Sequence, residues 1–266
     1  MGARSRRSWT RREFCRALLA GGLGAGAACL WPETAEAPHS GGDGDFVFAQ
    51  LRYRGGNWDP YPTAGLPLME EVERRTTVEP VRRRHVVEAT SSDVFRYPFL
   101  YMAGRYEFDP FGDEEVEALR RHLRFGGFLL ADDSLGQRDF GFDEAMRRLV
   151  SRLFPRQALR PLPPDHAVYR SYYLIRRVVG RQVVNPYLEG VSVDDFTPVI
   201  YSQNDLGGAW ARDADGRWLR ECVPGGEDQR RDAFRLGVNL VIYALTENYK
   251  RDLVHHPFIR RRLNIN

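Results

Sequence analysis

Short apolar runs alternate with amphipathic segments along the first half of this chain, and the alternation limits the fold more than any other feature. Three runs have the length and composition of buried strands: 46–51, 97–104 and 128–131. Each is followed by a segment whose apolar residues recur at helical spacing: 66–75, 113–124 and 142–154. Such an alternation predicts an α/β fold, a three-layer sandwich in which helices cover both faces of a mainly parallel sheet.

The second half of the chain has a less regular pattern. Residues 168–179 and 188–202 have the composition of extended chain, which predicts a hairpin or edge strands. Residues 228–249 are predicted to form a long helix with apolar side chains on nearly every side. Such a helix is typically packed against a sheet and covered. A basic tail, 251–266, closes the chain. It is either a solvated end or a contact for an anionic lipid or partner.

The first 37 residues have the order of an export signal. Arg11 and Arg12 form a twin-arginine pair, and a weakly apolar run at 17–31 precedes the small-x-small sequence at 35–37. The run is shorter than the roughly 20 residues that a spanning helix needs. We therefore predict a twin-arginine signal peptide at 1–37, a Gly-rich linker at 38–45 and a protein of the periplasm or cell envelope. The alternative is a chance arginine pair in an arginine-rich chain.

Removal of such a signal would change the charge of the protein. The whole chain has 39 basic and 36 acidic residues and a formal net charge of +3. Subtracting the six arginines and three glutamates of residues 1–37 leaves 33 of each sign, and therefore no net charge. This balance argues against nucleic acid as a partner.

The cysteines are few and mostly lie in the predicted signal. Cys15 and Cys29 would leave with it, so Cys222 alone would remain and no intramolecular disulfide could form. Residues 26–29 weakly resemble a lipoprotein cleavage box, although the usual leucine three residues before the cysteine is missing. Membrane contact is therefore expected only during export, unless Cys29 carries a lipid anchor.

Several motifs, in order, resemble the bacterial domain of unknown function family 4159. They are FVFAQLRYRGGN at 46–57, residues 97–104, GGFLLADDS at 126–134, residues 166–169 and IYSQNDLGGAW at 200–210. The family is similar in fold to class I glutamine amidotransferases and trehalose-utilisation-like proteins, which implies a flavodoxin-like domain at 46–250. It implies no established reaction. Its members are often exported and associated with MoxR-type ATPases and von Willebrand A-domain proteins, which implies envelope partners of that kind.

The chain departs from the amidotransferases at their nucleophile. Those enzymes place a cysteine on a sharp strand-to-helix elbow, but no Gly-x-Cys-x-Gly sequence occurs here. The equivalent place, after the strand at 128–131, holds Asp132, Asp133 and Ser134, whereas the sequence around Cys222 is typical of a loop. We therefore do not expect thiol-based glutamine hydrolysis.

Ligands of open α/β sheets bind beyond the carboxyl ends of the strands, and four groups of side chains are expected to converge there. They are Arg52, Tyr53 and Asn57; Asp132 and Asp133; His166; and Ser202, Asn204 and Asp205. Two carboxylates and a histidine could hold a divalent metal or act as general base and acid. Alternatively, the aspartates cap helices or bind loop amides, and His166 is bonded to its neighbours in a loop.

Aromatic side chains in Gly- and Pro-rich segments add to this candidate site. Trp58, Tyr61 and Trp210 could stack on a sugar ring or a partner's side chain, or they could attach their loops to the core. We predict a non-catalytic module of the cell envelope that binds a ligand or a partner. The alternatives are a metal- or carboxylate-dependent hydrolase acting on carbohydrate or another envelope polymer, and a structural component of an ATPase-linked assembly. The sequence identifies no cofactor and leaves any metal open.

Overall fold

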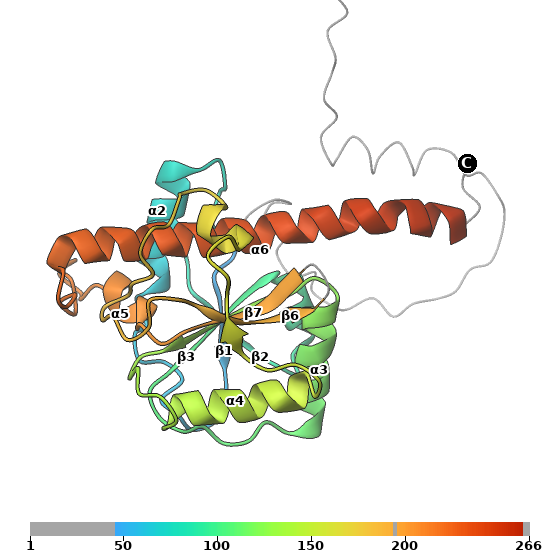
Figure 1. Cartoon of the computed structure of the whole chain (residues 1–266), viewed down its shortest axis with the longest axis horizontal. Helices are drawn as coiled ribbons and strands as arrows, with labels where there is room; N and C mark the ends of the chain where they lie inside the picture. Colours follow the sequence, from blue (N-terminus) through green and yellow to red (C-terminus); the bar gives the residue numbers. More distant parts are fainter. Residues whose placement is uncertain (1–45, 194–195, 263–266) are drawn as a thin grey trace, which may run out of the picture. The chain divides into compact units, whose positions relative to one another are not determined.

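The computed structural model of the chain describes residues 46–193 and 196–262, and of 247–262 it describes the backbone alone. The predicted signal peptide with Arg11, Arg12 and Cys29, and the predicted linker at 38–45, lie outside these residues. The described chain forms a β-sheet between two layers of helices (Figure 1). The predicted three-layer α/β sandwich is therefore confirmed.

The sheet has seven strands within the described residues, in the order β2-β1-β3-β4-β7-β6-β5. Their bounds are β1 Ala49–Arg52, β2 His85–Glu88, β3 Phe99–Gly104, β4 Phe128–Asp133, β5 Arg160–Pro161, β6 Glu189–Val193 and β7 Phe196–Ser202. The first five strands of that order are parallel. β6 pairs antiparallel with β7, and β5 pairs antiparallel with β6. Numbered among themselves, the parallel strands have the 2-1-3-4-5 order of flavodoxin-like sheets.

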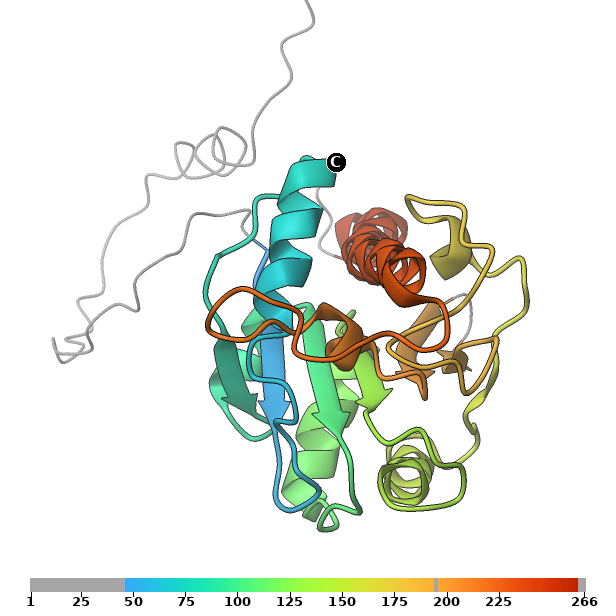
Figure 2. The same ribbon diagram turned by 90° about the vertical axis from the view of Figure 1, so that its left-hand side faces the viewer.

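Helices cover the two faces of the sheet in two groups (Figure 2). One face, called the α6 face, carries α2 (Gly65–Arg75), η2 (Ala167–Arg170), α5 (Leu206–Trp210) and α6 (Gly226–Arg262). The other, called the α4 face, carries η1 (Ser92–Arg96), α3 (Asp113–Arg124) and α4 (Phe142–Leu153). Successive residues of a strand point to opposite faces, so Tyr101 packs in the core under α6 and Met102 in the core under α4.

Helix α3 has the bounds that its apolar spacing predicts. Asp113, Glu114 and Glu115 lie in its first turn, where negative charge favours the helix dipole. The Glu115 carboxylate also accepts a hydrogen bond from the Gly112 amide at 2.6 Å. Its apolar stripe, which includes Val116, Leu119 and Leu123, is buried on the α4 face.

The prediction for residues 168–179 is wrong, because they form η2 and irregular chain rather than strands. Asn239 of α6 holds this segment: its amide nitrogen donates to the carbonyls of Val168 (2.7 Å) and Tyr173 (2.8 Å). Its oxygen accepts from the Tyr173 amide at 2.7 Å. These bonds satisfy backbone groups that a strand would pair in a ladder. The extended chain predicted at 188–202 is confirmed, since these residues carry the antiparallel strands β6 and β7.

Helix α6 is longer at both ends than the predicted 228–249. Its backbone stays helical from Gly226 to Arg262 and so crosses the boundary expected at residue 250. Leu236, Leu240 and Val241 are fully buried, as expected of a covered helix. Among the described residues, no helix is both long enough and apolar enough to span a membrane.

Candidate functional site

The carboxyl ends of β3, β4 and β7 lie beside one another, because the register pairs Gly104 with Asp133 and Asp132 with Ser202. β4 extends two residues further than predicted, so Asp132 and Asp133 are its last residues rather than part of a loop. Both are fully buried, as is Asp205 after β7. Three carboxyl groups are therefore placed below the surface at one edge of the sheet.

Asp132 points to the α6 face and caps the short helix α5. It accepts hydrogen bonds from the backbone amides of Leu206 (2.9 Å) and Gly207 (2.7 Å) and from the Tyr101 hydroxyl (2.8 Å). Burial, reinforced by the nearby Asp205 carboxylate, raises the pKa of Asp132 to about 7. The group is thus bound on both oxygens, and its protonation changes near neutral pH.

Asp205 is the N-cap residue of α5 and takes a left-handed backbone conformation (φ 58°). It accepts from the Gly208 amide and the Tyr61 hydroxyl, both at 3.1 Å, and forms an ion pair with Arg181. A Cβ on Gly208 would lie 2.4 Å from the Asp205 carboxylate, so this approach requires glycine. Burial raises the pKa of Asp205, although Arg181 opposes that shift.

Asp133 points to the α4 face and belongs to a different network. It accepts from the Leu135 amide at 2.8 Å, and the Tyr201 hydroxyl lies 3.5 Å from it and 3.0 Å from Asp143. Arg147 then joins Asp143 (3.0 Å) to Glu189 (2.8 Å). Burial raises the pKa of Asp133 to about 6. The two adjacent aspartates therefore occupy opposite sides of the sheet, where one caps a helix and the other binds a loop amide.

His166 does not join the aspartates, so the expected convergence of all four groups is not observed. Its Nδ1 accepts from the Val168 amide at 3.2 Å, and its Nε2 lies 3.0 Å from the Thr197 hydroxyl. Thr197 lies near the start of β7, whereas Asp132 pairs with Ser202 at its end. Five residues of strand separate the two positions by roughly 16 Å.

Ser202 and Asn204 organise neighbouring backbone. The Ser202 hydroxyl accepts from the Asn204 amide at 3.2 Å. The Asn204 side chain donates to the carbonyls of Val178 (3.2 Å) and Asn185 (2.7 Å) and accepts from the amides of Val184 and Asn185. This asparagine therefore holds the 178–185 segment against the carboxyl edge. Both side chains are buried.

The two tryptophans of the candidate site, Trp58 and Trp210, differ in their accessibility. Trp210 lies on α5 rather than in a loop, is fully buried and donates from its indole nitrogen to the Ala233 carbonyl at 3.1 Å. It is a core residue and has no surface for stacking on a ligand. Trp58 is half-buried, and the guanidinium groups of Arg52 and Arg84 lie 5.8 and 5.4 Å from its ring centre.

Of the candidate-site residues at the end of β1 and in the loop after it, some lie in the core and others at the surface. Arg52 is exposed and lies 3.9 Å from the Glu88 carboxylate. Tyr53 is buried, and its hydroxyl donates to the Ala103 carbonyl at 2.7 Å. Asn57 is exposed in a left-handed turn with φ 56°. Of this group, Arg52, Asn57 and part of Trp58 are open to a ligand.

Sequence reasoning missed several residues of this edge. Arg105 directly follows β3; its Nε is buried without a partner, and its Nη2 lies 3.5 Å from the Tyr61 hydroxyl. Tyr106 and Phe140, in the loops after β3 and β4, are 54% and 52% exposed. Val183 and Val184 are also exposed, and Val184 lies close to Gly136 in the loop after β4. We call Tyr106, Phe140, Val183 and Val184 the rim. For Arg105 and Tyr106, the place directly after the predicted strand at 97–104 was the available signal.

Among the described residues, this edge carries neither a cluster of metal ligands nor an exposed thiol. No group of three or more His, Cys, Asp or Glu in the described residues is arranged to hold a metal ion. Cys222 is buried in the loop before α6, and burial raises the pKa of its thiol. The arrangement is therefore a bonded polar core beneath an exposed rim.

The profile of one protein family, described as a domain of unknown function (DUF4159), matches residues 47–245. The chain belongs to this family. The DUF4159 match runs from the residues before β1 into α6 and includes the whole candidate site. The family predicted from the sequence motifs is thereby confirmed. No curated protein matches the chain.

Proposed function

We propose that this DUF4159 protein is an exported, non-catalytic module that binds a ligand or partner of the cell envelope through its carboxyl-edge loops. The observation that carries the proposal is a contrast at that edge. The buried carboxylates are occupied by bonds within the protein, while the loops around them expose the apolar rim.

The buried half of this contrast argues against catalysis. Asp132 holds the amides of α5, and Asp133 holds the amide of Leu135. The flavodoxin-like strand order supports kinship in fold with the class I glutamine amidotransferases. At the place of their cysteine, this chain has aspartates that accept hydrogen bonds from its own backbone amides. A carboxylate that accepts such bonds could contact a substrate only if these bonds to the backbone were lost.

The exposed half of the contrast argues for binding. A Cβ built on Gly141, next to Phe140, would lie 3.5 Å from the Tyr106 Cα, and one on Gly136 would lie 2.7 Å from the Val184 side chain. The rim residues therefore come from neighbouring loops. Exposed aromatic and apolar side chains on neighbouring loops are typical of interaction surfaces.

Site-specific photocrosslinking in the native organism tests the rim. A photoreactive amino acid replaces Phe140 in one variant and Phe125 in a matched control. Phe125 is 84% exposed and lies just before β4, at the opposite edge of the sheet. We expect a specific adduct from position 140 and none from position 125. Equal adducts from both positions, or none from either, would contradict the proposal.

The hydrolase remains the second candidate, because the pKa values of Asp132 and Asp133 are raised to about 7 and about 6. Groups that titrate near neutral pH suit general acid–base chemistry. The test is release of soluble fragments from peptidoglycan and other envelope polysaccharides by the purified protein. Turnover that Asp133→Asn abolishes, with the variant still folded, would establish the hydrolase and refute the binding module.

Export by the twin-arginine route is part of the proposal, supported by the sequence at 10–14. The variant Arg11→Lys/Arg12→Lys should leave the precursor in the cytoplasm, while Arg6→Lys/Arg7→Lys serves as the control and should be exported. Efficient export of the first variant would refute the route. Fatty-acid labelling that Cys29→Ala removes would show a lipid anchor. The partners that we propose to seek are envelope proteins linked to MoxR-type ATPases and von Willebrand A-domain proteins.

A further inference from the structure

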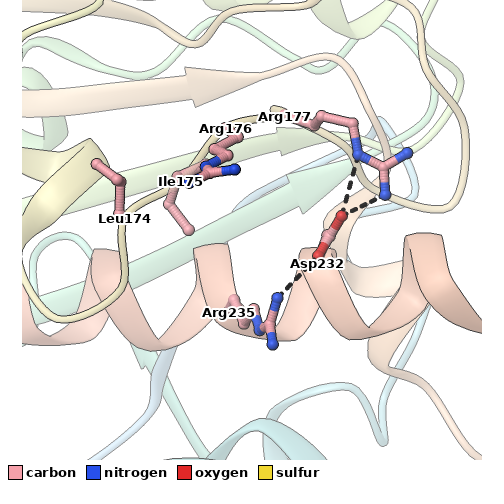
Figure 3. A pocket seen from close by; sticks show the side chains of 6 residues that line it. All are labelled: Leu174, Ile175, Arg176, Arg177, Asp232 and Arg235. Atoms are coloured by element: carbon pink, nitrogen blue, oxygen red, sulfur yellow. Dashed lines mark hydrogen bonds and ion pairs between the residues drawn. The ribbon is translucent and has the colours of Figure 1, made fainter.

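A pocket of about 370 Å³ lies between α6 and the irregular chain after η2, and no rim residue lines it. Figure 3 shows the side chains that line it: Leu174, Ile175, Arg176, Arg177, Asp232 and Arg235. The volume lies in the lower part of the range of small-molecule sites. No residue of the candidate site at the carboxyl edge contributes to it.

The lining of the pocket has an excess of positive charge. Arg177 donates from Nε to the Asp232 carboxylate at 3.1 Å, and Arg235 lies 3.4 Å from its other oxygen. Arg176 has no ion pair within the part of the chain that the structure describes. The lining therefore holds three arginines and one aspartate, an excess of two formal positive charges. The excess favours an anion in the pocket.

The other end of the pocket is apolar. Leu174 is 72% exposed and Ile175 is partly buried, and in Figure 3 both lie on the side away from Arg177. The segment that carries them is held in place, since Asn239 binds the backbone of Tyr173 and the Ile175 amide donates to the Tyr169 carbonyl at 2.8 Å. A fixed apolar wall reduces the ordering cost of binding.

We propose that this pocket is a binding site for a small organic anion with an attached apolar group. The carboxylate or phosphate would lie between Arg176 and Arg235, since the planar guanidinium pairs with such groups through two parallel hydrogen bonds. The apolar part would cover Leu174 and Ile175. Arg235 is already positioned, because its guanidinium lies 5.6 Å from the Tyr173 ring centre. The inference is independent of the rim.

Calorimetric titration of the purified full chain tests the site. The probes are hexyl phosphate, hexanoate and the uncharged hexanol. We expect saturable binding of at least one anion and none of hexanol, and the tighter anion identifies the preferred group. Arg176→Gln/Arg235→Gln should weaken that binding by about tenfold or more. The control Arg121→Gln/Arg124→Gln changes two exposed arginines of α3 and should bind as the native protein does.

A further variant has an effect of the opposite sign. Asp232→Asn removes the carboxylate that now occupies Arg177 and Arg235, so it should tighten anion binding by several-fold. A loss of folding could not produce this gain. The proposal is overturned if neither anion binds saturably, if the double arginine variant binds like the control, or if Asp232→Asn weakens binding.

Discussion

Asp132 and Asp133 are adjacent in the sequence and both fully buried, yet they lie in different halves of the molecule. Asp132 lies on the α6 face and accepts hydrogen bonds from two helix amides and a tyrosine hydroxyl. Asp133 lies on the α4 face, accepts a hydrogen bond from one loop amide and has a longer contact with the Tyr201 hydroxyl. The comparison teaches that a pair of acids at the end of a strand is divided by the sheet, because side chains alternate between its faces.

The two environments also differ in how much structure depends on the carboxylate. Helix α5 has only five residues, so its position rests on groups outside it, chiefly Asp132 and Asp205. On the other face, Asp143, Arg147 and Glu189 form further bonds in the same network. We therefore expect the α6 side to be more sensitive to loss of its aspartate.

The largest expected effect comes from Asp132→Ala. The change leaves the Leu206 and Gly207 amides and the Tyr101 hydroxyl buried without their acceptor. Several such groups together should lower the free energy of unfolding by about 3–5 kcal/mol, measured by urea denaturation. The control Asp215→Ala alters a largely exposed carboxylate and should change stability by less than about 0.5 kcal/mol. Equal losses in the two variants would show that Asp132 is not a structural cap.

The pH dependence of stability is the next largest effect. The folded pKa of Asp132 is about 7 and that of Asp133 about 6, both above the ordinary value of 3.8. The folded protein thus holds protons that the unfolded chain has released. This contribution to stability is complete below about pH 4 and is lost as the pH rises through about 7. Urea midpoints at pH 5 and pH 8 should show lower stability at pH 8, by on the order of 1 kcal/mol or more. A flat or rising profile would contradict these pKa shifts.

Two tyrosine variants compare the two faces directly. Tyr101→Phe removes a 2.8 Å bond to Asp132, and Tyr201→Phe removes a 3.0 Å bond to Asp143 together with the longer contact to Asp133. Each should cost about 1–2 kcal/mol in unfolding experiments, since the ring stays and only a buried hydroxyl is lost. We expect Tyr101→Phe to cost more, because Asp143 keeps its ion pair with Arg147. The reverse order would place the more sensitive network on the α4 face.

Much of the fold follows from local pattern, and the failures have physical causes. The helix at 113–124 was predicted to the residue because charge at both ends and apolar spacing agree. Strand β2, with only one buried residue, offers little apolar signal. Residues 168–179 have β-branched and aromatic side chains, but a buried asparagine 66 positions beyond Tyr173 binds their backbone instead. That contact between distant segments has no local signature.

The candidate site was predicted less well than the fold. The position of Asp132, Asp133 and Asp205 at the carboxyl edge follows from the strand ends, and it was expected. Their division between faces depends on where β4 stops, two residues later than predicted. The place of His166 depends on the path of the long connection between β5 and β6, which local pattern does not define.

The smallest expected effect, and the sharpest contrast with Asp132, comes from Asp133→Asn. The asparagine oxygen can still accept from the Leu135 amide, so one bond is kept. At pH 5, where the raised pKa of about 6 leaves Asp133 mostly protonated, the variant should match the native protein within about 0.5 kcal/mol. As the pH rises to 8, the native protein ionises a buried group and the variant does not. The variant should therefore gain stability relative to the native protein, as urea midpoints at the two pH values would show. A variant that instead loses stability relative to the native protein between pH 5 and pH 8 would mean that the ionised Asp133 is the form that the α4 face stabilises.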